Sequence, residues 1–388
     1  MARRVFHLAL ASLATALVIG CDPGGSDDAR GPDSLAEAPS EPSRTLAAVP
    51  GPAHDRRHLH TATMLNDGRV LVVGGFGEGF VPLASAEVYD PVTGVWSQIG
   101  SMVQPRAEHA ASLLGDGRLL VTGGRDEVFV PLASAEVYDP STGLWSPYTD
   151  MAAQRRSHSA VVLRDGTVFV VGGNGRSRTL ASVETFDPST TAGTVIAPMR
   201  DEHGSHRVVV LSNGRVLVAG GVRMTNENMV AVGAELYDPA SAAWTDTGSM
   251  SRRTYAHSLT LLADGRALIA GGFGAGSGET AADIYDPATN TWTSVGRMSE
   301  GRMLHTATLL LDGRVLAVGG TNRHGNIASA ELYDPSTGVW TPAGEMSRKR
   351  SSHTATLLED GKVLVVGGDG TTAEIYDPTT GRWSFSGP

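Results

Sequence analysis

The feature that most constrains this chain is a unit that occurs seven times, at intervals of 48 to 51 residues. Each copy has a histidine, a Gly-Gly pair beginning fourteen residues later, and then an aromatic-Asp-Pro triplet such as Tyr89-Asp90-Pro91. Six copies place a Trp six residues after that Asp, and the third has Gly193 there. A regular period of this length is typical of solenoids and propellers, in which each repeat is one structural unit. The histidines are His60, His109, His158, His206, His257, His305 and His353.

Each unit has the local pattern of four short β-strands. An alternating stretch follows the histidine, an Asp-Gly or Asn-Gly pair comes next, and an apolar run such as Val70–Val73 leads into Gly-Gly. Asp-Gly and Asn-Gly favour two-residue hairpin turns. The second half of the unit supplies two more strands around a Pro-containing turn. The second strands are apolar throughout, which indicates that both faces are covered. Sheets packed face to face around an axis satisfy this requirement.

Taken together, the Gly-Gly pair after an apolar strand, the Tyr-Asp-Pro triplet, the Trp and an Arg-x-x-His sequence resemble the kelch repeat. The resemblance covers residues 51–388. It implies an all-β fold, a seven-bladed kelch β-propeller with four antiparallel strands per blade. It also implies the central propeller fold of galactose-oxidase-like enzymes, whose copper site needs a cysteine-crosslinked tyrosine. The only cysteine here is Cys21, ahead of the repeats, so that chemistry is not expected.

The N-terminus has the pattern of an export signal. Arg3 and Arg4 precede an apolar stretch that ends in Val18-Ile19-Gly20-Cys21, which resembles a bacterial lipobox. We expect residues 1–21 to be a signal peptide and Cys21 to be lipidated; the alternative is ordinary cleavage nearby that leaves a free thiol. Residues 22–50 are rich in Pro, Gly, Ser and acid and are predicted to be a disordered tether. Residues 44–50 could instead add an edge strand to the last blade. The expected location is the cell envelope, periplasmic or on the outer surface.

Length variation between the repeats is confined to one segment. The distance from the second Gly to the following Asp is 15, 15, 14, 17, 14, 14 and 9 residues, whereas the other spacings are constant. If the strands of each blade are named a to d in chain order, the b–c loop and the d–a segment lie on one face. Variable loops on one face of a repeat protein usually mark its binding side. That face carries eighteen basic and thirteen acidic residues, a net charge of +5 against −10 for the whole chain.

Nine arginines of this face are the predicted ligand contacts: Arg57, Arg106, Arg125, Arg155, Arg176, Arg223, Arg302, Arg323 and Arg350. Five of them stand three residues before a repeated histidine. An acidic residue also stands three before the Asp of every triplet, at Glu87, Glu136, Glu184, Glu235, Asp283, Glu331 and Glu374. Because both features recur in most blades, the interpretation favoured for these five is a scaffold of paired arginine and carboxylate. The repeated histidines are expected to hydrogen-bond the neighbouring blade rather than to bind a metal.

These patterns favour an interaction module whose b–c and d–a loops bind a protein or glycan, with an anionic ligand suiting the positive face. The alternative is a carbohydrate-active enzyme with acid/base residues at the mouth of the central channel, for which Glu78, Glu127 and Glu279 are conceivable bases. No catalytic residue, cofactor or metal is predicted. The negative net charge argues against nucleic acid as a partner. We expect a monomer that contacts the membrane only through its lipid anchor.

Overall fold

The computed structural model describes residues 55–224, 229–274, 276–368 and 370–387. The chain divides into two units, Met1–Leu46 and Ala47–Pro388, and every described residue belongs to the second. The predicted signal peptide, Cys21 and the tether with residues 44–50 lie outside the described residues. Among the described residues, no helix has the length and hydropathy needed to cross a membrane.

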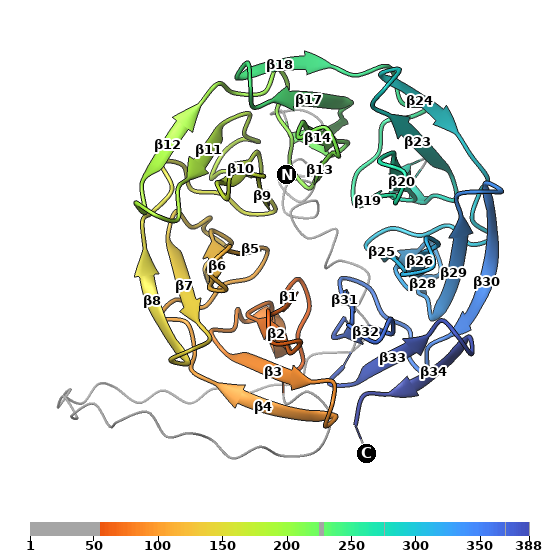
Figure 1. Cartoon of the computed structure of the whole chain (residues 1–388), viewed down its shortest axis with the longest axis horizontal. Helices are drawn as coiled ribbons and strands as arrows, with labels where there is room; N and C mark the ends of the chain where they lie inside the picture. Colours follow the sequence, from red (N-terminus) through yellow and green to blue (C-terminus); the bar gives the residue numbers. More distant parts are fainter. Residues whose placement is uncertain (1–54, 225–228, 275, 369, 388) are drawn as a thin grey trace, which may run out of the picture. The chain divides into compact units, whose positions relative to one another are not determined.

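The second unit consists of seven four-stranded antiparallel sheets arranged in a ring (Figure 1). Each sheet is formed by four strands of one repeat in chain order, so the prediction of a seven-bladed propeller is confirmed. The strands of blades 1 to 4 are β1 (Thr61–Met64), β2 (Val70–Val73), β3 (Ala86–Asp90), β4 (Val95–Ile99); β5 (Ala110–Leu113), β6 (Leu119–Thr122), β7 (Ala135–Asp139), β8 (Leu144–Tyr148); β9 (Ser159–Val162), β10 (Val168–Val171), β11 (Val183–Phe186), β12 (Gly193–Ile196); and β13 (Arg207–Val210), β14 (Val216–Ala219), β17 (Ala234–Asp238), β18 (Ala243–Asp246).

The strands of blades 5 to 7 are β19 (Ser258–Leu261), β20 (Ala267–Ala270), β23 (Ala282–Asp286), β24 (Thr291–Ser294); β25 (Thr306–Leu309), β26 (Val315–Val318), β29 (Ser329–Asp334), β30 (Val339–Glu345); and β31 (Thr354–Leu357), β32 (Val363–Val366), β33 (Ala373–Asp377), β34 (Arg382–Phe385). The first strand of each blade lies nearest the centre and the fourth lies at the rim (Figure 1). The chain therefore runs from the inside to the outside of each blade before it passes to the next.

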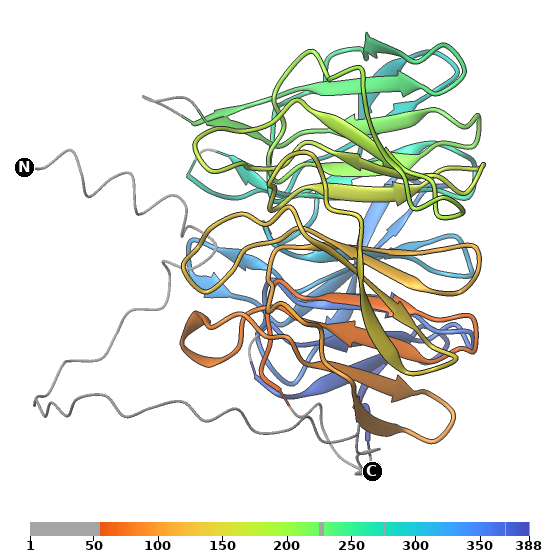
Figure 2. The same ribbon diagram turned by 90° about the vertical axis from the view of Figure 1, so that its left-hand side faces the viewer.

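The b–c loops contain elements that the repeat pattern did not predict. Blade 1 has a short 3-10 helix, η1 (Glu78–Phe80). Blades 4, 5 and 6 each add a small two-stranded hairpin. These are β15 (Val222–Met224) with β16 (Met229–Ala231), β21 (Phe273–Gly274) with β22 (Ser277–Gly278), and β27 (Thr321–Asn322) with β28 (Gly325–Asn326). The loop of blade 1 and the small hairpin of blade 6 extend on the same side of the ring (Figure 2).

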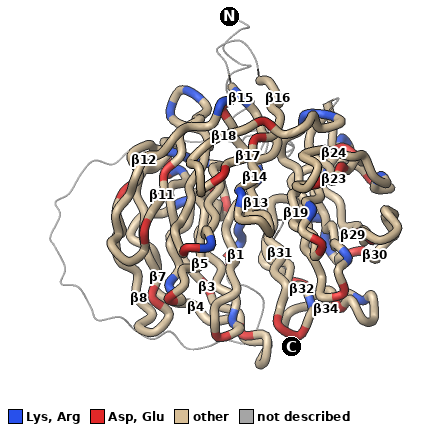
Figure 3. Tube along the Cα trace, turned by 45° about the horizontal axis from the view of Figure 1, so that its top comes forward, with Lys and Arg blue, Asp and Glu red and all other residues tan. Residues whose placement is uncertain are grey.

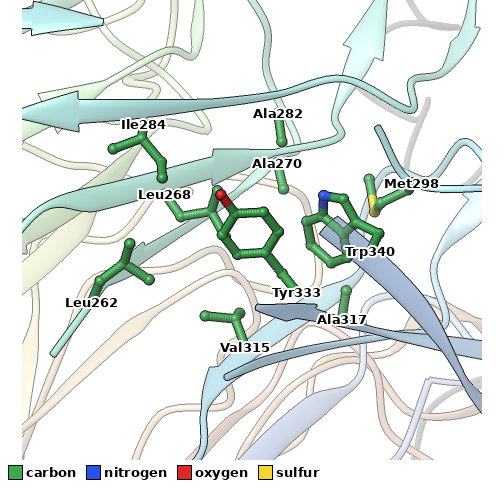
Figure 4. Packing of buried hydrophobic residues seen from close by; sticks show 10 residues of the cluster. All are labelled: Leu262, Leu268, Ala270, Ala282, Ile284, Met298, Val315, Ala317, Tyr333 and Trp340. Atoms are coloured by element: carbon green, nitrogen blue, oxygen red, sulfur yellow. The ribbon is translucent and has the colours of Figure 1, made fainter. Parts of the chain in front are cut away.

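The hydrophobic core lies between blades rather than within one sheet. All four residues of each second strand, for example Val70–Val73 of β2, are buried on both faces. Between blades 5 and 6, Leu268 and Ile284 pack against Val315 and Tyr333 of the following blade (Figure 4). Burial of apolar surface between neighbouring sheets contributes roughly 25 cal/mol per Å². Each blade therefore depends on both of its neighbours for stability.

Hydrogen bonds join each blade to the next. We call the interface between two neighbouring blades a seam, and the bonds occur at all seven seams, including the one between blades 7 and 1 that closes the ring. The N–H of the second Gly of each pair donates to the carbonyl at the first position of the next Arg-x-x-His sequence, as in Gly75 to Arg106 at 2.9 Å. The closing seam has the same bond, from Gly368 N–H to the carbonyl of Arg57 at 2.9 Å. There Trp96 Nε1 also donates to Ser386 Oγ at 3.3 Å. The described ring thus closes with all four strands of blade 7 taken from its own repeat.

A second set of backbone bonds surrounds the centre of the ring. The residue before each repeated histidine has a positive φ between 50° and 58° although none is glycine. At six seams its N–H donates to the carbonyl of the equivalent residue in the preceding blade, as in Glu108 to Leu59 at 3.1 Å and Leu59 to Ser352 at 3.0 Å. A left-handed conformation costs a non-glycine residue roughly 1–2 kcal/mol. The inter-blade hydrogen bonds offset this cost. The seven residues are Leu59, Glu108, Ser157, Ser205, Ala256, Leu304 and Ser352.

The Gly-Gly pairs allow close approach of the neighbouring backbone. Gly74 has a φ of +58°, and a Cβ placed there would lie 2.6 Å from the carbonyl oxygen of Arg106 and 2.9 Å from Cε1 of His109. A Cβ on Gly75 would lie 2.6 Å from Cβ of His60. Real Cβ atoms essentially never come under 3.0 Å, so a larger residue at Gly74 requires movement of the next blade, and one at Gly75 requires movement of the inner strand of its own blade.

We expect Gly74→Ala to lower the free energy of unfolding by about 2–3 kcal/mol, from the left-handed backbone and the contact with the next blade. Gly79→Ala is the matched control, because Gly79 has a φ of +66° but nothing within 4 Å of its added Cβ. The control should cost only about 1 kcal/mol. Urea unfolding of both variants measures the difference. Equal losses would show that close approach of the blades is not what requires the first glycine.

Candidate functional site

The b–c loops and the d–a segments pair with each other on one face of the ring. In blades 1 to 6 the residue after the Gly-Gly pair forms an isolated β-bridge with the residue two before the histidine, as in Phe76 with His58, Arg125 with Ala107 and Thr321 with Met303. These bridges fix the variable loops beside the entrance to each inner strand. The variable face predicted from the sequence therefore has a defined backbone framework. Basic and acidic residues are interspersed along the trace (Figure 3).

Five of the nine predicted ligand contacts are buried within their blades. The guanidinium of Arg106 is typical: Nη1 donates to the carbonyl of Gly123 at 2.8 Å, and Nη2 lies 2.7 Å from Oε1 of Glu136. Glu136 in turn accepts the backbone N–H groups of Val103 and Gln104 in the d–a segment. Burial lowers the pKa of Arg106, and Glu136 opposes that shift. The five residues in this arrangement are Arg57, Arg106, Arg155, Arg302 and Arg350.

This burial corrects the assignment of these five arginines to a ligand surface. Their side chains are fully buried and are held by carbonyl oxygens and a carboxylate of their own blade. They connect the base of the b–c loop to the d–a segment, which is the scaffold interpretation. Blades 4 and 5 replace the arginine: His203 Nε2 lies 3.1 Å from Glu235, and Thr254 donates to the carbonyl of Gly271.

The other four predicted contacts lie on different blades and in different environments. Arg125 is almost fully buried between the rings of Phe76 and Phe129, at 4.5 and 4.7 Å from their centroids, and forms an ion pair with Glu108. Arg176 and Arg323 are exposed, on the loops of blades 3 and 6. Arg223 is partly exposed and forms an ion pair with Asp201 at 3.1 Å. The structure does not bring these four together in one site, and their role in binding stays a prediction.

The repeated histidines hydrogen-bond the preceding blade at five seams. His109 Nε2 lies 2.9 Å from Thr61 Oγ1, and His353 Nε2 lies 2.9 Å from Thr306 Oγ1. Burial lowers the pKa of His109 to about 3, with the charge of Arg106 as the next cause, so the ring is neutral at pH 7. The prediction that these histidines connect blades is therefore confirmed at these seams. No group of three or more His, Cys, Asp or Glu suited to a metal ion occurs within the described ranges.

A basic cavity of about 400 Å³ lies on the variable face beside the closing seam. Arg56 from the segment before blade 1, and Arg348 and Lys349 from the segment before blade 7, line it together with Gly370, Thr371 and Thr372. Blade 7 has the shortest b–c loop of the seven. Three basic side chains and two threonines supply donors for an anionic group. None of the described residues that line this cavity is acidic.

Exposed apolar side chains lie at the tips of two neighbouring b–c loops. Phe80 and Val81 of blade 1 and Val128 and Phe129 of blade 2 are 37%, 55%, 68% and 55% exposed. Both phenylalanines have a positive φ, of 60° and 62°. A strained backbone that presents a large apolar side chain to solvent is frequently part of a binding surface. Residues 80–91 and 129–140 have the identical sequence FVPLASAEVYDP, which explains why the two loops have the same conformation.

The three carboxylates considered as bases lie on separate loops, and their role in catalysis stays a prediction. Glu78, Glu127 and Glu279 lie on the loops of blades 1, 2 and 5. Glu279 forms an ion pair with Arg252 at 2.5 Å. In the described part of the chain, no hydrogen bond links any two of these three residues. General acid/base catalysis requires two groups within reach of one substrate.

The sequence contains matches to the kelch motif at residues 56–103, 106–152, 155–199 and 302–347, which correspond to blades 1, 2, 3 and 6. A search of curated proteins finds no match. Among solved structures, a fungal alcohol oxidase of the AA5 family, in complex with copper, is similar with a TM-score of 0.68. The likeness is 22% in sequence and covers 84% of this chain and 73% of the oxidase. At this identity it shows a common fold. With its seven in-register blades, the chain belongs to the kelch-repeat β-propellers.

Proposed function

We propose that this propeller is an interaction module of the cell envelope that binds a negatively charged protein or glycan on the face formed by its b–c loops and d–a segments. The observation that carries the proposal is the cavity lined by Arg56, Arg348 and Lys349. An acidic group entering it would meet several donors in a partly enclosed space, where charge-assisted hydrogen bonds are stronger than in open water.

The apolar loop tips support a macromolecular partner rather than a small ion alone. Interfaces combine a central apolar patch with a polar rim, and aromatic residues are enriched in them. Phe80 and Phe129 supply the aromatic part, and the cavity beside blade 1 supplies the charged part. Anchoring to the envelope through Cys21 would keep the propeller among other envelope components. The kelch fold is consistent with such a binding scaffold.

Removing two of the cavity's charges should weaken binding of an acidic partner. We expect Arg348→Ala/Lys349→Ala to reduce affinity for an Asp/Glu-rich peptide or for oligogalacturonate about tenfold or more, equivalent to about 1.4 kcal/mol. Isothermal titration calorimetry at low and high salt measures this, and the wild-type affinity should fall as salt rises. Comparison of the two probes shows which class of partner is preferred.

Arg382→Ala is the control, because Arg382 begins β34 at a c–d turn, on the opposite face. Its replacement should leave the affinity unchanged. Phe80→Ser/Phe129→Ser tests the apolar part and should weaken the peptide more than the oligosaccharide. If the Arg348/Lys349 variant binds both probes as tightly as the wild type, the cavity is not the binding site. If neither probe binds at millimolar concentration, the proposed class of partner is wrong.

A further inference from the structure

The first position of each innermost strand departs from its pattern in one blade. The residue that follows each repeated histidine is Thr, Ser or Ala in six blades, and it is Arg207 in blade 4. Arg207 is the one charged side chain on the seven innermost strands β1, β5, β9, β13, β19, β25 and β31, all of which the structure describes. The strand β13 lies at the inner end of its blade (Figure 1), and Arg207, its first residue, retains exposed surface.

In several blades the side chain at this position hydrogen-bonds the repeated histidine of the following blade. Thr61, Ser258 and Thr306 each place a hydroxyl within 3.0 Å of Nε2 of the histidine in the following blade. At the seam between blades 4 and 5, Arg207 replaces that hydroxyl, and among the described residues Nε2 of His257 has no hydrogen-bond partner. Nε2 of His206, at the preceding seam, has none there either. A guanidinium carries donors only and cannot accept a hydrogen bond. Burial also lowers the pKa of His257 to about 3, so its neutral ring offers no countercharge.

The same seam lacks the backbone bond found at the other six. At those seams the N–H of the residue before the histidine donates to the preceding blade, as in Leu304 to Ala256 at 2.9 Å. No such bond is formed from Ala256 N–H to Ser205 among the described residues. Ser205 and Arg207 are two residues apart at the start of β13. Among the described residues, the seam between blades 4 and 5 therefore has both a backbone N–H without this acceptor, that of Ala256, and a cation, Arg207.

Arg207 has no acidic partner within ion-pair distance in the part of the chain that the structure describes. The hydrogen bond found for its guanidinium runs from Nη1 to the carbonyl of His206 at 3.2 Å. The protein that surrounds the guanidinium lowers its pKa by desolvation, although the side chain keeps exposed surface. Its charge lowers the pKa of His257 and of His305, which belong to the two following blades. The charge thus acts on the two following blades, and among the described residues no carboxylate pairs with it. A cation in surroundings of this kind is stabilised by an anion.

We propose that Arg207 and the N–H of Ala256 bind a small anion at the centre of the ring, such as chloride or a carboxylate or phosphate group. The planar guanidinium matches carboxylate and phosphate geometry, and a single N–H adds a further donor. The site is separate from the cavity beside blade 7 and does not depend on the ligand proposed for the loop face. Its occupant stabilises the seam that lacks two of the regular inter-blade hydrogen bonds.

The test measures the thermal unfolding of the full chain as a function of anion concentration. Chloride, formate and phosphate are titrated separately as sodium salts, with ionic strength held constant by the bulky HEPES anion. A ligand that binds only the folded state raises Tm in a saturable way. We expect saturation with at least one of the three, and its identity distinguishes a halide site from an oxyanion site.

Arg207→Thr should abolish the saturable rise or weaken the apparent affinity at least tenfold. This variant should fold, because threonine occupies the same position in blades 1, 6 and 7 and restores a hydroxyl for His257. Without added anion its Tm should equal or exceed that of the wild type. Arg207→Lys, which keeps the charge but loses the planar fork, should weaken the response. Arg382→Thr on the rim is the control and should respond like the wild type.

Two results would overturn the proposal. One is a wild-type Tm that changes only with ionic strength and shows no saturation with any of the three salts. The other is a wild-type response retained by both Arg207→Thr and Arg207→Lys. Binding of the acidic peptide or oligogalacturonate should be the same in wild type and Arg207→Thr. That comparison separates failure of the central site from failure of the loop-face site.

Discussion

Replacing Arg106 with methionine is expected to lower the free energy of unfolding by about 3–5 kcal/mol, the usual cost of removing one partner from a buried ion pair. The Arg106 guanidinium makes hydrogen bonds to Gly123, Ser134 and Glu136 inside blade 2. Methionine fills much of the volume but leaves the Glu136 carboxylate buried without its cation. The unfolding free energy from urea titration measures the loss.

Two further variants show whether the lost pairing is the cause. Arg106→Met/Glu136→Gln should recover part of the stability, because the neutral amide can still accept from the N–H groups of the d–a segment. Arg69→Met removes an exposed arginine that pairs with Asp67 at an a–b turn, and should cost less than about 1 kcal/mol. A loss below 1 kcal/mol for Arg106→Met would show that the buried pair does not hold the blade together.

Acidification is expected to unfold the propeller near pH 5 because its repeated histidines are buried and neutral. Burial lowers the pKa of all seven, and to about 3 for His109, His257 and His353. In the unfolded chain a histidine has a pKa of about 6.5. Above that pH both states are neutral and the stability contributed is fully present. Below it the unfolded chain takes up protons that the folded chain does not, and stability is lost until the pH reaches the folded pKa.

Between pH 6.5 and the folded pKa, each such histidine lowers the free energy of unfolding by up to about 1.4 kcal/mol for each unit by which the pH falls. Because domains are stable by only about 5–15 kcal/mol, several histidines acting together suffice to unfold the ring within two pH units below 6.5. Measuring Tm between pH 7.5 and 4 gives the slope of Tm against pH. His109→Gln should reduce the slope, and His324→Gln, at an exposed ring on the blade 6 hairpin, should not change it. A Tm that stays constant down to pH 4 would contradict the prediction.

The fold was predictable because the signals repeat. The constant spacing from histidine to Gly-Gly and the apolar second strands determine the blade, and seven copies determine the ring. The close approach at Gly74 was also predictable, since a glycine pair in a strand often indicates a nearby backbone. The hairpins in the loops of blades 4 to 6 were not predicted, because their sequences differ from blade to blade and have no common turn pattern.

The candidate site was predictable only in part. Arg57, Arg106, Arg155, Arg302 and Arg350 were assigned to the ligand surface because they lie in the d–a segments. Their regular spacing from the histidine was the signal that they are structural. Arg348 and Lys349 are among the eighteen basic residues counted on the variable face. The cavity that they line depends on how the short loop of blade 7 sits beside blade 1, which no local pattern specifies.

Arg207 could have been found from the sequence by aligning the seven units with one another. The column after the histidine reads Thr, Ala, Ser, Arg, Ser, Thr and Thr, so that one blade breaks an otherwise small and uncharged series. In a protein built from copies, a residue that differs at an otherwise uniform position is more informative about binding than one that recurs.

The way in which the ring closes has a mechanical consequence. Six of the seven seams are crossed by the peptide chain, whereas in the described structure blades 7 and 1 meet only through contacts such as Gly368 with Arg57 and Trp96 with Ser386. All four described strands of blade 7 come from its own repeat. Under a pulling force or on heating, the ring should therefore open first between blade 1 and blade 7, the first and the last to be synthesised. The basic cavity lies beside this seam, so a ligand that contacts both blades there would hold the ring closed.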